Sequence, residues 1–256
     1  DSPMLKIDRL TKKFGGLAAV NDVSTTIEAG KVNAIIGPNG AGTTTFFNLI
    51  SSMHKPSSGT ITFNGQDVTS LRPDQVAQLG VARTFQTTAL FDRSTVLDNL
   101  IVGHRLRTRS GLWDVLRGSS RLREEERVCR EKAREALDFV GLSRIAHRLA
   151  GDITQEERKR VAFALALATD PKLLLLDEPT EGIQPNIIKD IGRVIKHLAH
   201  DKGLSVVLVE QFYDFAEELA DQYLLMQRGE IVMRGRGVNM KEDGVREKIG
   251  RATSEL

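Results

Sequence analysis

A glycine-rich stretch, IIGPNGAGTTTFFNLI at residues 35–50, has the residue types and spacing of a phosphate-binding loop. Such loops carry a glycine, four residues, a second glycine, a lysine and then a serine or threonine. Backbone N–H groups of the loop and the N-terminus of the following helix bind phosphate oxygens. The residues that we expect to line a nucleotide are Gly37, Asn39, Gly40, Ala41, Gly42, Thr43, Thr44 and Thr45.

Thr43 stands where the pattern has its lysine, and it cannot place a positive charge on the phosphates. A charge-assisted hydrogen bond contributes about 1.5–3 kcal/mol net, so its loss weakens nucleotide binding roughly 10- to 100-fold. We expect the rate of any reaction at the bound phosphates to fall by a larger factor than the affinity, because the lysine charge also stabilises the transition state. Taken alone, the stretch is also compatible with a glycine-rich turn that binds no ligand.

An acidic pair ends the apolar run LLLLDEP at residues 173–179. Four leucines predict a buried strand, which leaves Asp177 and Glu178 at its carboxyl end, where open α/β sheets bind ligands. Asp177 is suited to the shell of a Mg²⁺ ion, for which the hydroxyl of Thr44 is a further ligand. Glu178 is suited to act as a general base on an attacking water. Without the upstream loop, a helix cap is the alternative interpretation of this acidic pair.

The elements that must position these residues follow from hydrophobic periodicity. Alternating and apolar runs between residues 4 and 36 predict strands, the last of them ending at Gly37, and TTTFFNLISSM predicts a helix. Asn64-Gly65 predicts a hairpin turn, and Arg228-Gly229 predicts another. Residues 74–140 are expected to be mostly helical, with Leu122, Val128, Ala133, Leu137 and Val140 at helical spacing. Strands and helices alternate after residue 170, which predicts a parallel sheet.

The bulk composition restricts the class of protein. The 256 residues carry a formal net charge of +2, which is too balanced to indicate a nucleic-acid partner. Cys129 is the one cysteine, so no internal disulfide is expected. No apolar run reaches the roughly 20 residues that span a bilayer, and residues 1–10 lack a signal-peptide core. A cytoplasmic protein is therefore expected, whose role at a membrane would depend on a partner.

With these motifs in order, the chain resembles the ATP-binding subunit of ABC transporters over nearly its whole length. The resemblance implies an α/β fold: a P-loop NTPase core with a mixed, mainly parallel sheet, an antiparallel β subdomain and a helical subdomain. It implies one domain over residues 4–250, with the helical subdomain at about 88–165 and a C-terminal tail at about 235–256. The cofactors that it implies are ATP and Mg²⁺.

The resemblance also implies roles for residues outside the loop. Phe14, in KKFGGLAAVNDVS, lies where the family stacks an aromatic ring on adenine, although a core phenylalanine is the alternative. Gln86, in VARTFQ, matches the family's glutamine that reaches Mg²⁺ and couples to the membrane subunit. Gln211 lies where most of the family has a histidine near the γ-phosphate; it can donate a hydrogen bond there but carries no charge. The catalytic set is therefore Glu178, Gln211 and Gln86, and the metal set is Thr44, Gln86 and Asp177.

The segment ITQEE, residues 153–157, departs from the family's Leu-Ser-Gly-Gly-Gln signature. In the family, that signature holds the γ-phosphate of ATP bound to the partner subunit. Gln155 and Glu156 replace its glycines here, and acidic side chains suit a helix N-terminus but repel phosphate.

Within the family, the segments ARTFQ and TVLDNLIVGH resemble the ATPases of branched-chain amino-acid importers. The segment DEPTEGIQPNIIKDIG resembles the urea-importer ATPases and the second ATPase of the branched-chain pair. The expected function is to couple MgATP binding and hydrolysis to uptake of branched-chain amino acids, amides or urea. The expected partners are membrane permease subunits, a second ATP-binding subunit and, indirectly, a periplasmic solute-binding protein, at the cytoplasmic face of the inner membrane. Two alternatives remain: a degenerate subunit with little hydrolysis, and a soluble relative that acts on DNA or ribosomes.

Overall fold

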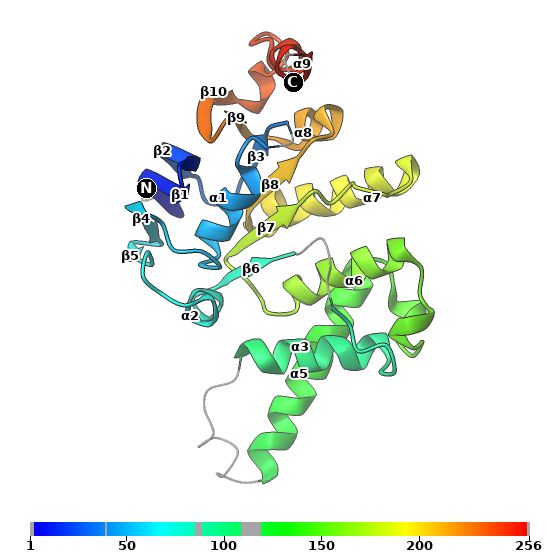
Figure 1. Cartoon of the computed structure of the whole chain (residues 1–256). Helices are drawn as coiled ribbons and strands as arrows, with labels where there is room; N and C mark the ends of the chain where they lie inside the picture. The colour runs from blue at the N-terminus through cyan, green and yellow to red at the C-terminus, as the bar shows by residue number, and fades with distance from the viewer. Residues whose placement is uncertain (1–2, 39, 85–88, 109–118, 255–256) are drawn as a thin grey trace. The chain divides into compact units, whose positions relative to one another are not determined.

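The computed structural model describes residues 3–38, 40–84, 89–108 and 119–254. The chain divides into two compact units (Figure 1). The first combines residues 1–83 with 172–256, and the second spans residues 84–171. The bounds of the helical subdomain expected from the sequence, about 88–165, fall inside the second unit.

A six-stranded sheet forms the centre of the first unit, in the order β10-β9-β3-β8-β7-β6. Strands β9, β3, β8, β7 and β6 run parallel to one another, and β10 pairs antiparallel with β9. A separate antiparallel sheet has the order β2-β1-β4-β5. The fold class inferred from the sequence is thus confirmed, and both predicted hairpins are present. The strands are β1 Leu5–Phe14, β2 Leu17–Ile27, β3 Val32–Ile36, β4 Ser58–Phe63, β5 Gln66–Asp67, β6 Val81–Arg83, β7 Leu173–Asp177, β8 Ser205–Glu210, β9 Gln222–Gln227 and β10 Glu230–Arg236.

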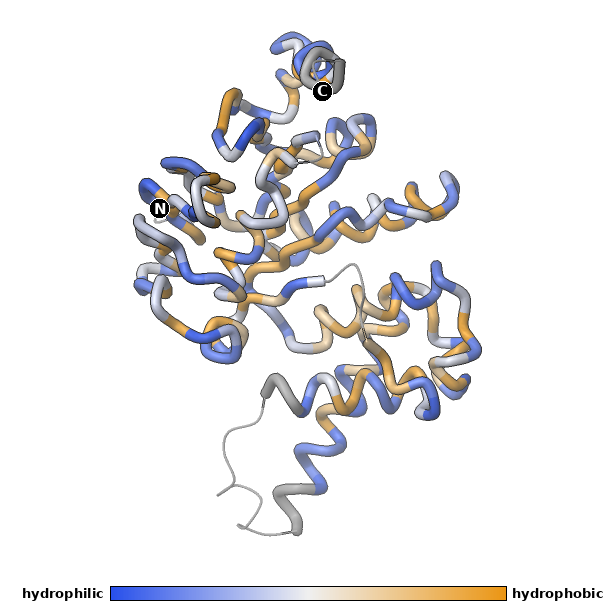
Figure 2. Tube along the Cα trace, in the orientation of Figure 1, coloured by the Kyte–Doolittle hydropathy of each residue, from blue (hydrophilic) through white to orange (hydrophobic). Residues whose placement is uncertain are grey.

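Both faces of the central sheet are covered, as its continuous apolar strands require. Helix α1, Thr43–Ile50, packs with the antiparallel sheet against one face, in a core that contains Phe46, Ile35 and Leu175. Alternate residues of the same strands, among them Ile36, face the other side and pack with α8, Tyr213–Leu219. Figure 2 shows these strands as an apolar centre within the unit. The remaining helices of this unit are α2 Pro73–Gln78, α7 Pro185–Lys196 with a π-helical turn at 197–201, and α9 Val245–Ser254.

The second unit is helical where the structure describes it. It contains α3 Val96–Thr108, α5 Ser119–Phe139 and α6 Gln155–Leu167. Val128, predicted to lie on the buried stripe of α5, is 39% exposed, whereas Cys129 beside it is buried. At this turn the buried stripe is thus shifted by one residue, since Cys129 lies four residues before the buried Ala133. The Cys129 sulfur contacts His104 of α3 at 3.3 Å. Among the described residues, none of the helices has the length and hydropathy needed to cross a bilayer.

Candidate functional site

The predicted chemistry gathers at one edge of the central sheet. Because β3, β8 and β7 are parallel neighbours, their carboxyl ends meet there. Ile36 lies opposite Glu210, and Val209 lies opposite Asp177. The glycine-rich loop, Asp177-Glu178 and Gln211 therefore all leave the sheet at the same edge, and all belong to the first unit.

The loop after β3 is shaped by its glycines. A Cβ atom on Gly42 would lie 2.4 Å from the carbonyl oxygen of Ala19, and Gly42 has a φ of 95°. A Cβ atom on Gly37 would lie 2.8 Å from the carbonyl oxygen of Met226. Neither position can carry a side chain without moving the backbone. The N–H of Gly229 also donates to the carbonyl of Ala41 at 2.9 Å, which fixes the loop against the β9–β10 turn.

Helix α1 begins at Thr43, directly after Gly42. The first N–H groups of a helix have no acceptor within the helix, so those of Thr43, Thr44 and Thr45 point toward the loop as donors. No acidic residue lies in this first turn and no side chain caps it. The positive end of the helix dipole is thus left for an anion, and the hydroxyl of Thr44 lies on an exposed residue.

Asp177 ends β7 and is 6% exposed. One of its carboxylate oxygens accepts a hydrogen bond from the guanidinium of Arg83 at 3.3 Å. Arg83 is 8% exposed, and its guanidinium lies 5.6 Å from the centre of the Phe47 ring. Burial lowers the pKa of Arg83, and the charge of Asp177 opposes that shift.

Glu178 follows in a left-handed backbone conformation, with a φ of 46°. Its N–H donates to the carbonyl of Val209 at 2.8 Å, which ties it to the end of β8. Burial, followed by a hydrogen bond to Glu181 and nearby negative charge, raises the pKa of Glu178 to about 7. A carboxyl group with a pKa near neutrality can accept and release a proton under physiological conditions.

Glu210 ends β8 and is 3% exposed. One of its carboxylate oxygens accepts the N–H groups of Gln211 and Phe212, each at 3.1 Å. Burial raises the pKa of Glu210. Glu210 therefore shapes the backbone at Gln211, whose own side chain is exposed at the edge of the site.

Phe14 lies at the end of β1 and is 47% exposed. Its ring meets that of His54 edge-on at 5.6 Å, and the Lys12 ammonium lies 5.3 Å from its centre. Phe14 is thus a surface residue, so the alternative of a core phenylalanine is wrong. It belongs to the β1–β2 hairpin, whose residue Ala19 packs on Gly42.

Asn39 and Gln86 lie outside the described residues, so their predicted roles stay predictions. Sequence reasoning missed Arg83 and Glu210. A signal was present for Glu210, a glutamate that closes the apolar run SVVLVE. Arg83 follows two apolar residues, a run too short to indicate a strand. Both are charges in strands that are buried on both faces, where unpaired charge is costly.

The ITQEE segment lies in the second unit, at the N-terminus of α6. Thr154 is the N-cap: its hydroxyl accepts the N–H of Glu157 at 3.1 Å, while the Glu157 carboxylate accepts the N–H of Thr154 at 3.0 Å. These bonds lower the pKa of Glu157. The helix dipole is thus balanced by the chain's own acidic residues.

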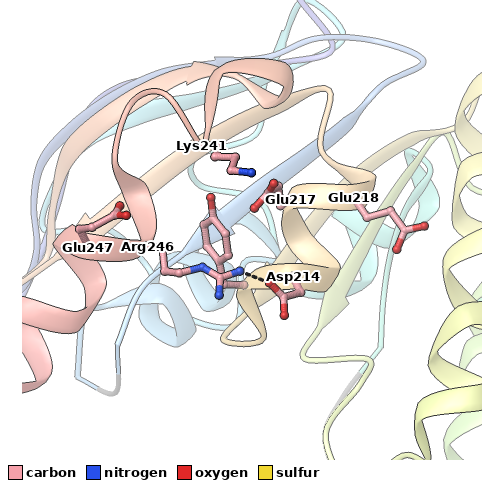
Figure 3. Close-up of a pocket in the computed structure, with 7 residues that line it drawn as sticks. Asp214, Glu217, Glu218, Lys241, Arg246 and Glu247 are labelled. Carbon is pink, nitrogen blue, oxygen red and sulfur yellow. Dashed lines mark hydrogen bonds and ion pairs between the residues drawn. The ribbon is translucent and has the colours of Figure 1, made fainter.

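A cavity of about 580 Å³ lies between α8 and the C-terminal segment of the first unit (Figure 3). Arg246 of α9 forms an ion pair with Asp214, and its guanidinium lies 4.6 Å from the centre of the Tyr213 ring. Burial and a hydrogen bond to Glu217 raise the pKa of Tyr213 to about 12. These contacts join α9 to α8, which begins at Tyr213, directly after Gln211 and Phe212.

The residues at the sheet edge fit a nucleotide with a divalent cation. The glycine cradle admits close approach of phosphate to the backbone, and the helix N-terminus favours an anion. A threonine hydroxyl and an aspartate carboxylate are hard oxygen ligands of the kind that Mg²⁺ takes beside phosphate.

Known proteins share this arrangement. The sequence profile of the ABC transporter family matches residues 20–181. The high-affinity branched-chain amino acid transport ATP-binding protein LivG of Escherichia coli K12 is 31% identical over 252 residues, covering 98% of this chain and 99% of that protein. A solved ATP-binding cassette of an ABC transporter in its ADP conformation has a TM-score of 0.86 at 30% identity, with 100% of both chains covered. A dimeric ATP-binding cassette in a post-hydrolysis state, bound to ADP and Pi, has a TM-score of 0.77 at 26% identity, covering 91% of this chain and 98% of that one. The chain therefore belongs to the ABC transporter family and is one of its ATP-binding cassettes, the ATPases of these transporters.

Proposed function

We propose that this chain binds MgATP at the carboxyl edge of its central sheet and couples that binding to the import of a small solute. The convergence of the loop, Asp177, Glu178 and Gln211 at one edge carries the proposal. The solute class is that of branched-chain amino acids, amides or urea. LivG, a branched-chain amino acid transport protein, supports the first of these by its similarity over nearly its full length.

Each residue at the edge has a role in this proposal. The loop from Gly37 to Thr45 holds the phosphates. Thr44, Asp177 and Gln86 would hold Mg²⁺, which when bound would neutralise negative charge on the phosphate oxygens. Glu178 takes a proton from the attacking water, because its pKa of about 7 suits that transfer. Gln211 and Gln86 orient the γ-phosphate, and the exposed ring of Phe14 stacks on adenine.

The proposed partners are membrane permease subunits, a second ATP-binding subunit and, through the permease, a periplasmic solute-binding protein. The dimeric relative supports the second of these. The proposed location is the cytoplasmic face of the inner membrane, as a peripheral subunit. A nucleic-acid partner is not proposed, because basic and acidic residues nearly balance, at 36 and 34.

A second candidate is a subunit that binds nucleotide but hydrolyses little. Two observations favour it: Thr43 lacks the charge of lysine, and the first turn of α6 carries Glu156 and Glu157 where the family binds a partner's phosphate. In this candidate, the chain occupies an ATPase position in a heteromeric transporter and regulates it.

Purification of the tagged chain from its native membranes tests the proposal. We expect membrane permease subunits to co-purify, and uptake of the solute to be lost in cells that carry only the Glu178→Gln variant. Retained uptake with that variant would favour the second candidate. Recovery of DNA or ribosomes without membrane subunits would contradict both candidates.

A further inference from the structure

Arg83 connects two parts of the candidate site that the sequence keeps far apart. Its guanidinium donates to the side-chain oxygen of Asn48 at 2.7 Å and to the hydroxyl of Ser51 at 3.0 Å. It also donates to Asp177 Oδ2 at 3.3 Å. The buried Arg83 side chain thus joins α1 and its C-cap residue Ser51 to the end of β7.

The two residues that Arg83 holds near α1 share a face with Thr44. Residues at i, i+4 and i+7 line one side of a helix, which places Thr44, Asn48 and Ser51 in one row. Thr44 and Asp177 are the two described residues proposed to hold Mg²⁺. Arg83 therefore donates hydrogen bonds to the face of α1 that carries Thr44, and it donates directly to Asp177.

We propose that Arg83 is a positioning residue for the divalent cation that accompanies the nucleotide. It fixes the Asp177 carboxylate through one oxygen and locks β7 to the Thr44 face of α1, so that both cation ligands are held at a set spacing. The inference rests on the proposed function. Groups that orient a metal ligand typically change metal affinity 10- to 100-fold when they are removed.

The opposing explanation is a buried ion pair with a purely structural role, which often contributes little to stability. The sign of the change in cation affinity separates the two explanations. Removing a positive charge beside a cation site would by Coulomb's law strengthen cation binding. Loss of positioning weakens it, even in a variant that keeps the positive charge.

Two charge-preserving variants therefore test the inference. Arg83→Lys keeps the charge but loses the planar fork that reaches several acceptors. Asn48→Ala keeps Arg83 and removes one of its anchors on α1. Arg72→Lys is the matched control, because Arg72 pairs with Asp74 in an exposed ion pair on the same unit. Circular dichroism verifies that each variant is folded.

The probe is Mn²⁺, whose free concentration is measured by electron paramagnetic resonance with the protein in excess over ATP, so that free ATP does not compete for the cation. ATP binding in EDTA is measured beside it by calorimetry. We expect the Mn²⁺ dissociation constant to rise about tenfold in Arg83→Lys and several-fold in Asn48→Ala. ATP binding in EDTA should stay at the wild-type value in both variants. The Mn²⁺ dissociation constant of the Arg72→Lys control should also equal that of the wild type.

An unchanged or lower Mn²⁺ dissociation constant in the two variants would overturn the inference and leave the proposed function intact. A parallel loss of ATP binding in EDTA would also overturn it, since Arg83 would then support the whole loop. If the wild-type chain bound no Mn²⁺ with ATP, the proposed function would fail, and the inference with it.

Discussion

At the scale of single residues, Glu178 has the environment of a group that changes its proton occupancy near neutral pH. Burial and its neighbours raise its pKa from 4.5 to about 7. Between these values the folded state binds more protons at Glu178 than the unfolded state does. The contribution of Glu178 to the free energy of unfolding therefore falls as the pH rises from about 4.5 to about 7.

The Glu178→Gln variant carries a neutral side chain of the same shape and lacks this pH dependence. We expect its stability relative to the wild type to increase as the pH rises from 5 to 8, measured by thermal unfolding at each pH. A stability difference that stays flat with pH would mean that Glu178 is ionised in the folded state.

At the residue scale, the sequence indicated where the backbone is constrained. Gly37 and Gly42, two glycines separated by four residues, lie where a Cβ atom would clash with the backbone carbonyl oxygen of Met226 or Ala19. Arg83 and Glu210 could not be identified in this way, because a buried charge is explained only by partners that the fold brings together. For Arg83 these partners are Asn48, 35 residues away, and Asp177, 94 residues away.

At the scale of elements, α6 shows how the ITQEE segment is used locally. Thr154 and Glu157 form a reciprocal capping box at its start. Thr154→Ala should therefore destabilise the start of α6 by about 1 kcal/mol, the usual contribution of an N-cap. Faster amide hydrogen exchange in the first turn of α6 would report the loss.

Thr154→Ser is the matched control, since it keeps the hydroxyl that accepts the N–H of Glu157. We expect its exchange rates to match those of the wild type. Equal protection in Thr154→Ala and Thr154→Ser would show that the cap contributes nothing to this helix.

Elements with long apolar patterns could be predicted, and short ones could not. The leucines of β7 and the apolar run of α6 are continuous, so their burial follows directly from the sequence. Strand β6 was missed within a region expected to be mostly helical, because Val81–Arg83 is too short to show an alternation. It exists through its parallel pairing with β7, a contact between residues about 90 positions apart.

At the scale of the whole molecule, the α6 start predicts how copies of this chain associate. A relative forms a dimer in a post-hydrolysis state. In this chain, Gln155 and Glu156 would have to face the phosphate of a second copy, and Glu156 would repel it. We therefore expect the purified chain to stay monomeric when MgATP is added.

Replacing Gln155 and Glu156 together with glycine, in the Glu178→Gln background, should allow MgATP-dependent dimers to form. Analytical ultracentrifugation with and without MgATP measures the change. The Glu178→Gln protein with an unaltered α6 start is the control and should stay monomeric. A dimer in that control would show that the acidic residues do not prevent association.

The central claim is that the loop remains a nucleotide site although Thr43 replaces the lysine. Calorimetric titration of MgATP into the wild type and into Thr43→Lys tests it most directly. We predict measurable binding by the wild type and binding roughly 10- to 100-fold tighter by Thr43→Lys, as expected for one charge-assisted hydrogen bond. Absence of MgATP binding by the folded wild-type protein would contradict the claim, whether or not Thr43→Lys binds.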